Sequence, residues 1–77
     1  MKKDLTVIIN GKSYPIKYAK DGNAYRVETN HDDLKPHVTD NFTFHIINGQ
    51  ANYLVISDKT HEIARQIIIQ INKNEFK

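Results

Sequence analysis

Imidazole and carboxylate side chains, the groups that bind divalent metal ions, are concentrated in one stretch of the chain. His31, Asp32, Asp33, His37 and Asp40 all lie within residues 31–40. Together they could hold zinc or a similar ion. No predicted helix or strand fixes their spacing, however, and a solvated loop is normally rich in such residues. We therefore expect no metal site, and a metal-assisted hydrolase around this loop is the weakest of three functional hypotheses.

Groups for nucleophilic catalysis are scarce. The chain has no cysteine, and its only serines are Ser13 and Ser57. A nucleophile must be held against a base, but turn and helix-capping roles already explain both serines. Gly11-Lys12-Ser13 matches the end of a phosphate-binding loop, yet Thr6 replaces the earlier glycine and no helix follows. We therefore expect a protein that is not an enzyme and that uses no cofactor.

Basic side chains offer different chemistry, namely the binding of an anionic partner such as a nucleic acid. The chain has 11 Lys+Arg against 9 Asp+Glu, and the basic residues are scattered along it. The candidates for phosphate contacts are Lys12, Lys17, Lys20 and Arg26. Three tyrosines that could stack on bases share a strand face with apolar residues: Tyr14, Tyr18 and Tyr25. Lys17 and Arg26 lie on the opposite face, so a nucleic-acid module is the alternative rather than the preferred hypothesis.

Three two-residue turn signals define the elements that position these side chains. They are Asn10-Gly11, Asp21-Gly22 and Asn48-Gly49, and such pairs tolerate the positive φ angles of tight hairpins. The β-branched or alternating runs around them predict strands over 5–9, 13–20, 24–29, 42–47 and 52–56. The polar stretch 30–41 between the third and fourth strands predicts a long loop with room for one helical turn.

The register of the first two hairpins is not equally defined. A turn at Asn10-Gly11 pairs apolar residues with apolar residues, for example Val7 with Tyr14. In the second hairpin a loop at 21–22 sets Lys17 opposite Arg26, whereas a loop at 22–23 sets Lys17 opposite Glu28. Turn chemistry favours the first arrangement and charge pairing favours the second. The apolar pattern is the same in both arrangements, so it does not decide between them.

The last part of the chain predicts a helix over 59–73. Cap candidates occupy 57–60 and Glu62 suits the first turn. An apolar stripe at helical spacing follows, formed by Ile63, Ala64, Ile67, Ile68 and Ile71. The competing hypothesis is a sixth strand, because the run 67–71 is rich in β-branched residues. Ile69 lies off the stripe and is expected to be exposed.

These elements predict an α+β fold with a five-stranded antiparallel sheet and one helix, in a single domain over residues 1–77. One helix covers one face of a sheet only. The second hairpin has apolar residues on both faces, so its other face needs a cover. The sheet could curl into a small barrel, the loop over 30–41 could fold under it, or a second molecule could cover it.

Length and composition limit the sources of stability and the cellular location that we expect. With no cysteine among 77 residues, disulfides and cysteine-bound zinc are excluded as sources of stability. No apolar run approaches the roughly 20 residues of a membrane span, and the start of the chain has no secretory core. We therefore expect a cytoplasmic location and no membrane contact.

The preferred hypothesis is a small non-enzymatic binding domain whose partner is another protein. The expected contact residues are Lys17 and Arg26 on the sheet and Ile69 on the helix. An exposed isoleucine together with an uncovered sheet face would mark a contact patch for a partner or for a weak homodimer.

Overall fold

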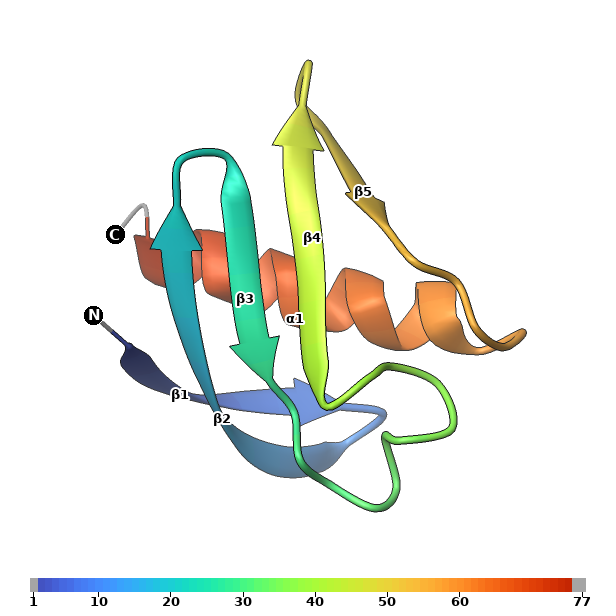
Figure 1. The fold of residues 1–77 in the computed structure, drawn as a ribbon. Helices are drawn as coiled ribbons and strands as arrows, with labels where there is room; N and C mark the ends of the chain where they lie inside the picture. The colour runs from blue at the N-terminus through green and yellow to red at the C-terminus, as the bar shows by residue number, and fades with distance from the viewer. Residues whose placement is uncertain (1, 76–77) are drawn as a thin grey trace.

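Five antiparallel strands and one C-terminal helix form the protein. The computed structural model describes residues 2–75. The elements are β1 (Lys3–Ile9), β2 (Lys12–Asp21), β3 (Ala24–Glu28), β4 (Asn41–Ile47), β5 (Gln50–Tyr53) and α1 (Thr60–Glu75). Each strand pairs with its neighbour in the chain, in the order β1-β2-β3-β4-β5 (Figure 1). The predicted α+β fold is confirmed, whereas the sixth strand considered for the last segment is wrong. Within residues 2–75, no helix is long and apolar enough to cross a membrane.

The hairpin turns follow the local sequence in two cases out of three. Asn10 and Gly11 both have positive φ angles, 52° and 82°, as do Asn48 and Gly49, at 54° and 77°. These values fit turns with positive φ at both central positions, so the predicted register of Val7 with Tyr14 is confirmed.

The turn between β2 and β3 follows charge pairing instead of turn chemistry. Asp21 pairs with Ala24, so the loop is residues 22–23, and Lys17 faces Glu28. Only Gly22 has a positive φ there, at 63°, which fits the hairpin turn that requires glycine at its first central position. The register with the loop at 21–22 is therefore wrong.

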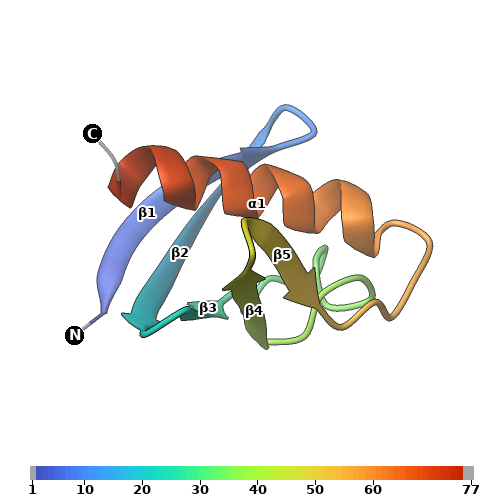
Figure 2. The ribbon, with the colours of Figure 1, turned by 90° about the horizontal axis from the view of Figure 1, so that it is seen from above.

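The core lies between one face of the curled sheet and α1. Figure 2 shows α1 lying along one side of the strands. The buried apolar residues of the strands are Val7, Ile9, Tyr14, Ile16, Tyr18, Tyr25, Val27, Phe42 and Phe44. The helix adds the predicted stripe: Ile63, Ala64, Ile67, Ile68 and Ile71. Strand alternation sends the remaining side chains to the outer face of the sheet, away from α1.

The loop between β3 and β4 closes one end of the core. Leu34 and Val38 are buried, and short turns form where the carbonyls of His31 and Leu34 accept backbone N–H groups. The loop does not fold under the other face of the second hairpin, as was considered; its buried residues lie at the end of the core instead. Within residues 2–75 the sheet is not closed into a barrel, because β1 and β5 do not pair.

The edge formed by β1 is occupied by two glutamines of α1. The Gln70 amide accepts the Ile8 N–H and donates to the Ile8 carbonyl, both at 2.7 Å. Gln66 accepts the N–H of Asn10 at 2.9 Å. These side chains satisfy backbone groups as a neighbouring strand would. The edge is therefore capped at the end of β1, at Ile8 and Asn10.

The last strand is shorter than predicted and begins earlier. The prediction of a strand over 52–56 is wrong at its C-terminal end, because β5 ends at Tyr53 and the next three residues leave the sheet. The start of α1 provides the reason. Thr60 Oγ1 accepts the N–H groups of Ile56 and Ser57, at 3.1 and 3.0 Å, and so directs this segment to the helix. The β-propensity of this segment is overridden by the hydrogen bonds from its backbone to Thr60.

Candidate functional site

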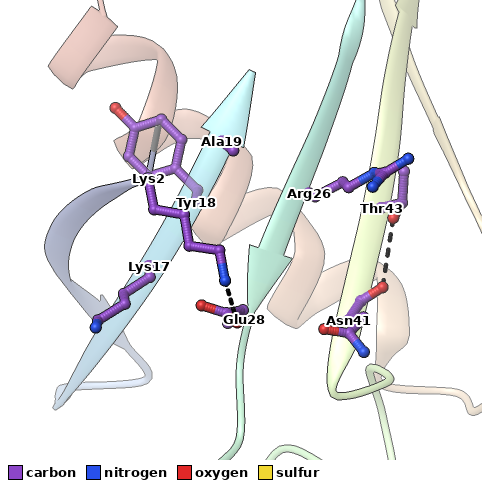
Figure 3. Close-up of a pocket in the computed structure, with 8 residues that line it drawn as sticks. All are labelled: Lys2, Lys17, Tyr18, Ala19, Arg26, Glu28, Asn41 and Thr43. Carbon is purple, nitrogen blue, oxygen red and sulfur yellow. Dashed lines mark hydrogen bonds and ion pairs between the residues drawn. The ribbon is translucent and has the colours of Figure 1, made fainter. Parts of the chain in front are cut away.

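A hollow of about 600 Å³ lies on the outer face of the sheet, on the side away from α1 (Figure 3). Three cationic side chains surround it, together with one carboxylate and two neutral polar groups. They belong to Lys2, Lys17, Arg26, Glu28, Asn41 and Thr43. Within residues 2–75, no helix or loop covers this face, so the hollow is open. We define it as the outer-face site.

A small residue in the middle of the sheet creates the hollow. Ala19 faces Arg26 across β2 and β3, and Arg26 faces Thr43 across β3 and β4. The side chain of Ala19 ends at Cβ, whereas its neighbours are long. Since opposing side chains on one face of a sheet stand side by side, the alanine becomes the floor between them.

Charges in the outer-face site are only partly compensated. Lys2 Nζ lies 2.8 Å from Glu28 Oε1. This hydrogen bond is the main reason that the pKa of Glu28 lies below its ordinary value, and the charge of Lys17 adds to the effect. Among residues 2–75, neither Lys17 nor Arg26 forms an ion pair.

The two uncompensated cations are not equivalent. Lys17 is flanked in the sheet register by carboxylates on both sides, Asp4 on β1 and Glu28 on β3. Arg26 is flanked by neutral residues, Ala19 and Thr43. Arg26 therefore provides the cation that is most available to an external anion.

The expected contact residues fall on two separate surfaces. The structure brings Lys17 and Arg26 together around one hollow. Ile69 is exposed as expected, on α1, and α1 packs on the other face of the sheet. Ile69 therefore cannot belong to the same contact surface as Lys17 and Arg26.

The four basic residues of the nucleic-acid hypothesis are also divided. Lys12 pairs with Asp33. Lys20 lies 5.7 Å from the centre of the Tyr25 ring. By strand alternation both lysines belong to the core-side face, opposite Lys17. One continuous basic surface does not result.

The histidine and aspartate residues of the loop bind to different parts of the protein. His31 Nε2 lies 2.7 Å from the Pro15 carbonyl, and Asp33 pairs with Lys12. His37 Nδ1 lies 2.6 Å from Ser57 Oγ. In the described part of the chain, no three histidine, aspartate or glutamate side chains are grouped as metal ligands. These contacts attach the loop to β2 and to the start of α1.

The contact between His37 and Ser57 was not predicted from the sequence. An imidazole beside a serine hydroxyl is the first element of a nucleophilic site. Ser57 Oγ also accepts the N–H of Lys59 at 3.2 Å, which is a helix-capping bond, and Thr60 donates to the His37 carbonyl at 2.6 Å. Within residues 2–75, no carboxylate bonds to the imidazole to orient it. The arrangement fits a structural joint between loop and helix.

Comparison with known proteins identifies no relative: no protein-family model, curated protein or solved structure matches the chain. The function must therefore be inferred from the chain's own side chains.

Proposed function

We propose that this protein is a non-enzymatic binding domain that recognises an acidic segment of another protein at the outer-face site. The observation that carries the proposal is the position of Arg26, which lies on an uncovered sheet face between two neutral neighbours. A guanidinium group presents a planar set of donors that matches a carboxylate in two-pronged geometry. Lys17 adds a second positive charge beside the same hollow.

The neutral groups of the site suit the backbone of a peptide. Asn41 and Thr43 offer an amide and a hydroxyl next to Arg26. The hydrogen bond from Thr43 Oγ1 to the Asn41 carbonyl is long, at 3.4 Å, so the hydroxyl is easily released to a ligand. Contacts of this polar and open kind are typical of transient protein interfaces, which are about as polar as the rest of a protein surface.

An acidic peptide fits this site better than a nucleic acid does. Single-stranded nucleic acids bind through phosphate contacts combined with stacking of bases on aromatic side chains. The tyrosines Tyr14, Tyr18 and Tyr25 are buried in the core. The outward positions of the described strands contain no aromatic ring other than the imidazole of His45. Tyr18 lines the hollow but is only 1% exposed, so it offers little ring surface on which a base could stack beside Arg26.

The proposal is tested by NMR titration with a glutamate-rich peptide and with its glutamine-substituted counterpart. We expect the glutamate-rich peptide to shift the resonances around Ala19 and the glutamine-substituted peptide not to shift them. Arg26→Gln should abolish the shift, and Lys17→Gln should weaken it.

Arg65→Gln is the matched control, because Arg65 is the other arginine of the chain and is exposed on α1. If Arg65→Gln reduces binding as much as Arg26→Gln, or if both peptides bind equally, the proposal fails. Tight binding of a mixed single-stranded oligonucleotide at physiological salt, lost in Lys17→Glu and Arg26→Glu, would establish the nucleic-acid alternative instead.

A further inference from the structure

A second hollow, separate from the outer-face site, lies on the core side of the sheet. Its volume is about 360 Å³. The turns after β2 and β4 are at the same end of the sheet, opposite the loop between β3 and β4 (Figure 1), and both turns line the hollow together with the C-terminal part of α1. We name it the turn-end pocket. The side chains that line it are Lys20, Asn23, Tyr25, Ile46 and Asn72.

Two glycines keep the mouth of the turn-end pocket open. Gly22 and Gly49 line it at the two turns. An added Cβ at either glycine would meet no atom within 4 Å, so no side chain of residues 2–75 fills the space beside them. Small-molecule sites have volumes of about 300–1,000 Å³. The pocket is therefore large enough for a small organic ligand.

The hydroxyl of Tyr25 is a polar group of this pocket that lacks a partner. The hydroxyls of the other three tyrosines bond to Asp33, Glu75 and His61. The Tyr25 hydroxyl forms no such bond within residues 2–75, although the residue is only 3% exposed. Every fully enclosed polar side-chain atom of the described chain has a partner, so this hydroxyl lies at the small accessible part of Tyr25. A ligand in the pocket would supply the missing hydrogen bond.

Lys20 places a positive charge next to the same ring. Its Nζ lies 5.7 Å from the centre of the Tyr25 ring. Lys20 forms no ion pair with any residue of the described chain. The carboxylate of Glu75, at the end of α1, is already bonded to Lys3 and Tyr18. The lining of the pocket thus contains one cation and no carboxylate, and this balance matches a ligand with a single negative charge.

We propose that the turn-end pocket binds a small organic acid, with its carboxylate at Lys20 and the Tyr25 hydroxyl and its apolar body against Ile46. An ammonium group and a phenol both donate hydrogen bonds to a carboxylate, and the Asn72 amide offers a further donor. Ile46 is partly buried and packs against the core, so it provides an apolar wall. This function is independent of the peptide recognition proposed for the outer-face site.

Benzoate and its uncharged counterpart benzamide test the proposal by NMR titration. We expect benzoate to shift the methyl resonances of Ile46 and the amide resonances of Gly22 and Gly49. The dissociation constant should be on the order of 1 mM, which suits a ligand of this size. Benzamide has the same ring without the charge, so it should bind at least about tenfold more weakly.

Two substitutions separate the charge of the pocket from its hydroxyl. Lys20→Gln should weaken benzoate binding by about tenfold or more. Tyr25→Phe keeps the ring in the core and should weaken binding by about fivefold. Lys17→Gln and Tyr53→Phe are the matched controls, because they remove a cation and a hydroxyl elsewhere on the protein. Both should bind benzoate like wild type.

The proposal is overturned if benzoate shows no saturable binding up to about 10 mM, or if benzamide binds as tightly as benzoate. It is also overturned if Lys20→Gln or Tyr25→Phe binds like wild type, or if Lys17→Gln weakens binding as much as Lys20→Gln. Benzoate-induced shifts around Ala19 instead of Ile46 would assign the carboxylate to Arg26 and equally refute a site at the turns.

Discussion

The phenol of Tyr18 in β2 donates a hydrogen bond of 2.7 Å to the carboxylate of Glu75, in the last turn of α1. Lys3 in β1 pairs with the same carboxylate at 2.6 Å, and the Asn74 amide donates to the Tyr18 oxygen at 2.7 Å. One buried tyrosine and one carboxylate thus attach the end of the helix to two strands. The stripe of isoleucines is held against the sheet by this polar junction as well as by apolar packing.

This junction predicts a pH dependence of stability. The hydrogen bonds from Lys3 and Tyr18 lower the pKa of Glu75 in the folded protein. A carboxyl whose folded pKa is lowered stabilises the protein above its unfolded pKa, and this contribution is lost as pH falls through the folded pKa. Urea unfolding should therefore show a smaller loss of stability between about pH 5 and pH 2 in Glu75→Gln than in wild type. Equal losses would contradict the prediction.

Tyr18→Phe tests the same junction at neutral pH. The substitution removes the hydroxyl and leaves the ring in the core, so the bonds to Glu75 and Asn74 are lost. We expect the free energy of unfolding to fall by about 1 kcal/mol. Tyr53→Phe is a suitable control, because the Tyr53 hydroxyl bonds only to the exposed His61 in the described structure. A larger effect for Tyr53→Phe would show that the junction contributes little.

The capped edge predicts a specific role for Gln70. Gln70→Ala removes both hydrogen bonds to the backbone of Ile8, and we expect a loss of about 1 kcal/mol in the free energy of unfolding. The exposed backbone groups should also exchange their amide hydrogen faster. Gln50→Ala, at the other edge, should be nearly neutral because Gln50 is exposed and its side chain makes no such bonds. Unchanged exchange at Ile8 in Gln70→Ala would refute the assigned role.

The register of β2 and β3 predicts unequal effects for two charge reversals. Lys17→Glu places a carboxylate between Asp4 and Glu28, so it should lower the midpoint of urea unfolding through like-charge repulsion. Arg26→Glu should change the midpoint little, because its register neighbours are neutral. In the alternative register, Lys17→Glu would gain a favourable pair with Arg26. A stabilised Lys17→Glu variant would therefore contradict the register.

The loop over 30–41 should not bind zinc specifically. His31 and His37 are already hydrogen-bonded to Pro15 and Ser57, so a metal ion would have to break these contacts to gain its ligands. Zinc titration followed by the imidazole resonances measures this directly. A saturable, stoichiometric shift confined to the loop histidines would overturn the prediction.

The sequence is sufficient to predict features that depend on neighbouring residues. Asn10-Gly11 and Asn48-Gly49 form the expected turns because positive φ is a local property of these pairs. The isoleucine stripe likewise predicts the buried face of α1, since helical spacing alone aligns Ile63, Ile67 and Ile71.

Features that depend on contacts between distant residues could not be predicted in the same way. The turn between β2 and β3 is shifted by one residue from the Asp-Gly pair, and the charge pairing of Lys17 with Glu28 is the signal that pointed to it. The end of β5 is decided by Thr60, whose hydroxyl also reaches His37, 23 residues away. Lys17 and Arg26 could be assigned to one face from strand alternation, but the role of Ala19 as the floor between long side chains depends on three strands lying side by side.

The two glutamines of α1 that bond to the edge of β1 bear on how copies of this protein could add to one another's sheets. A head-to-tail fibre requires two free edges on each molecule, since β5 of one copy must join β1 of the next. The backbone groups of Ile8 and Asn10 are already bonded to Gln70 and Gln66, so this end of the β1 edge is not free to pair with another copy. The amide side chains of α1 therefore act against head-to-tail growth of a sheet at this end of β1.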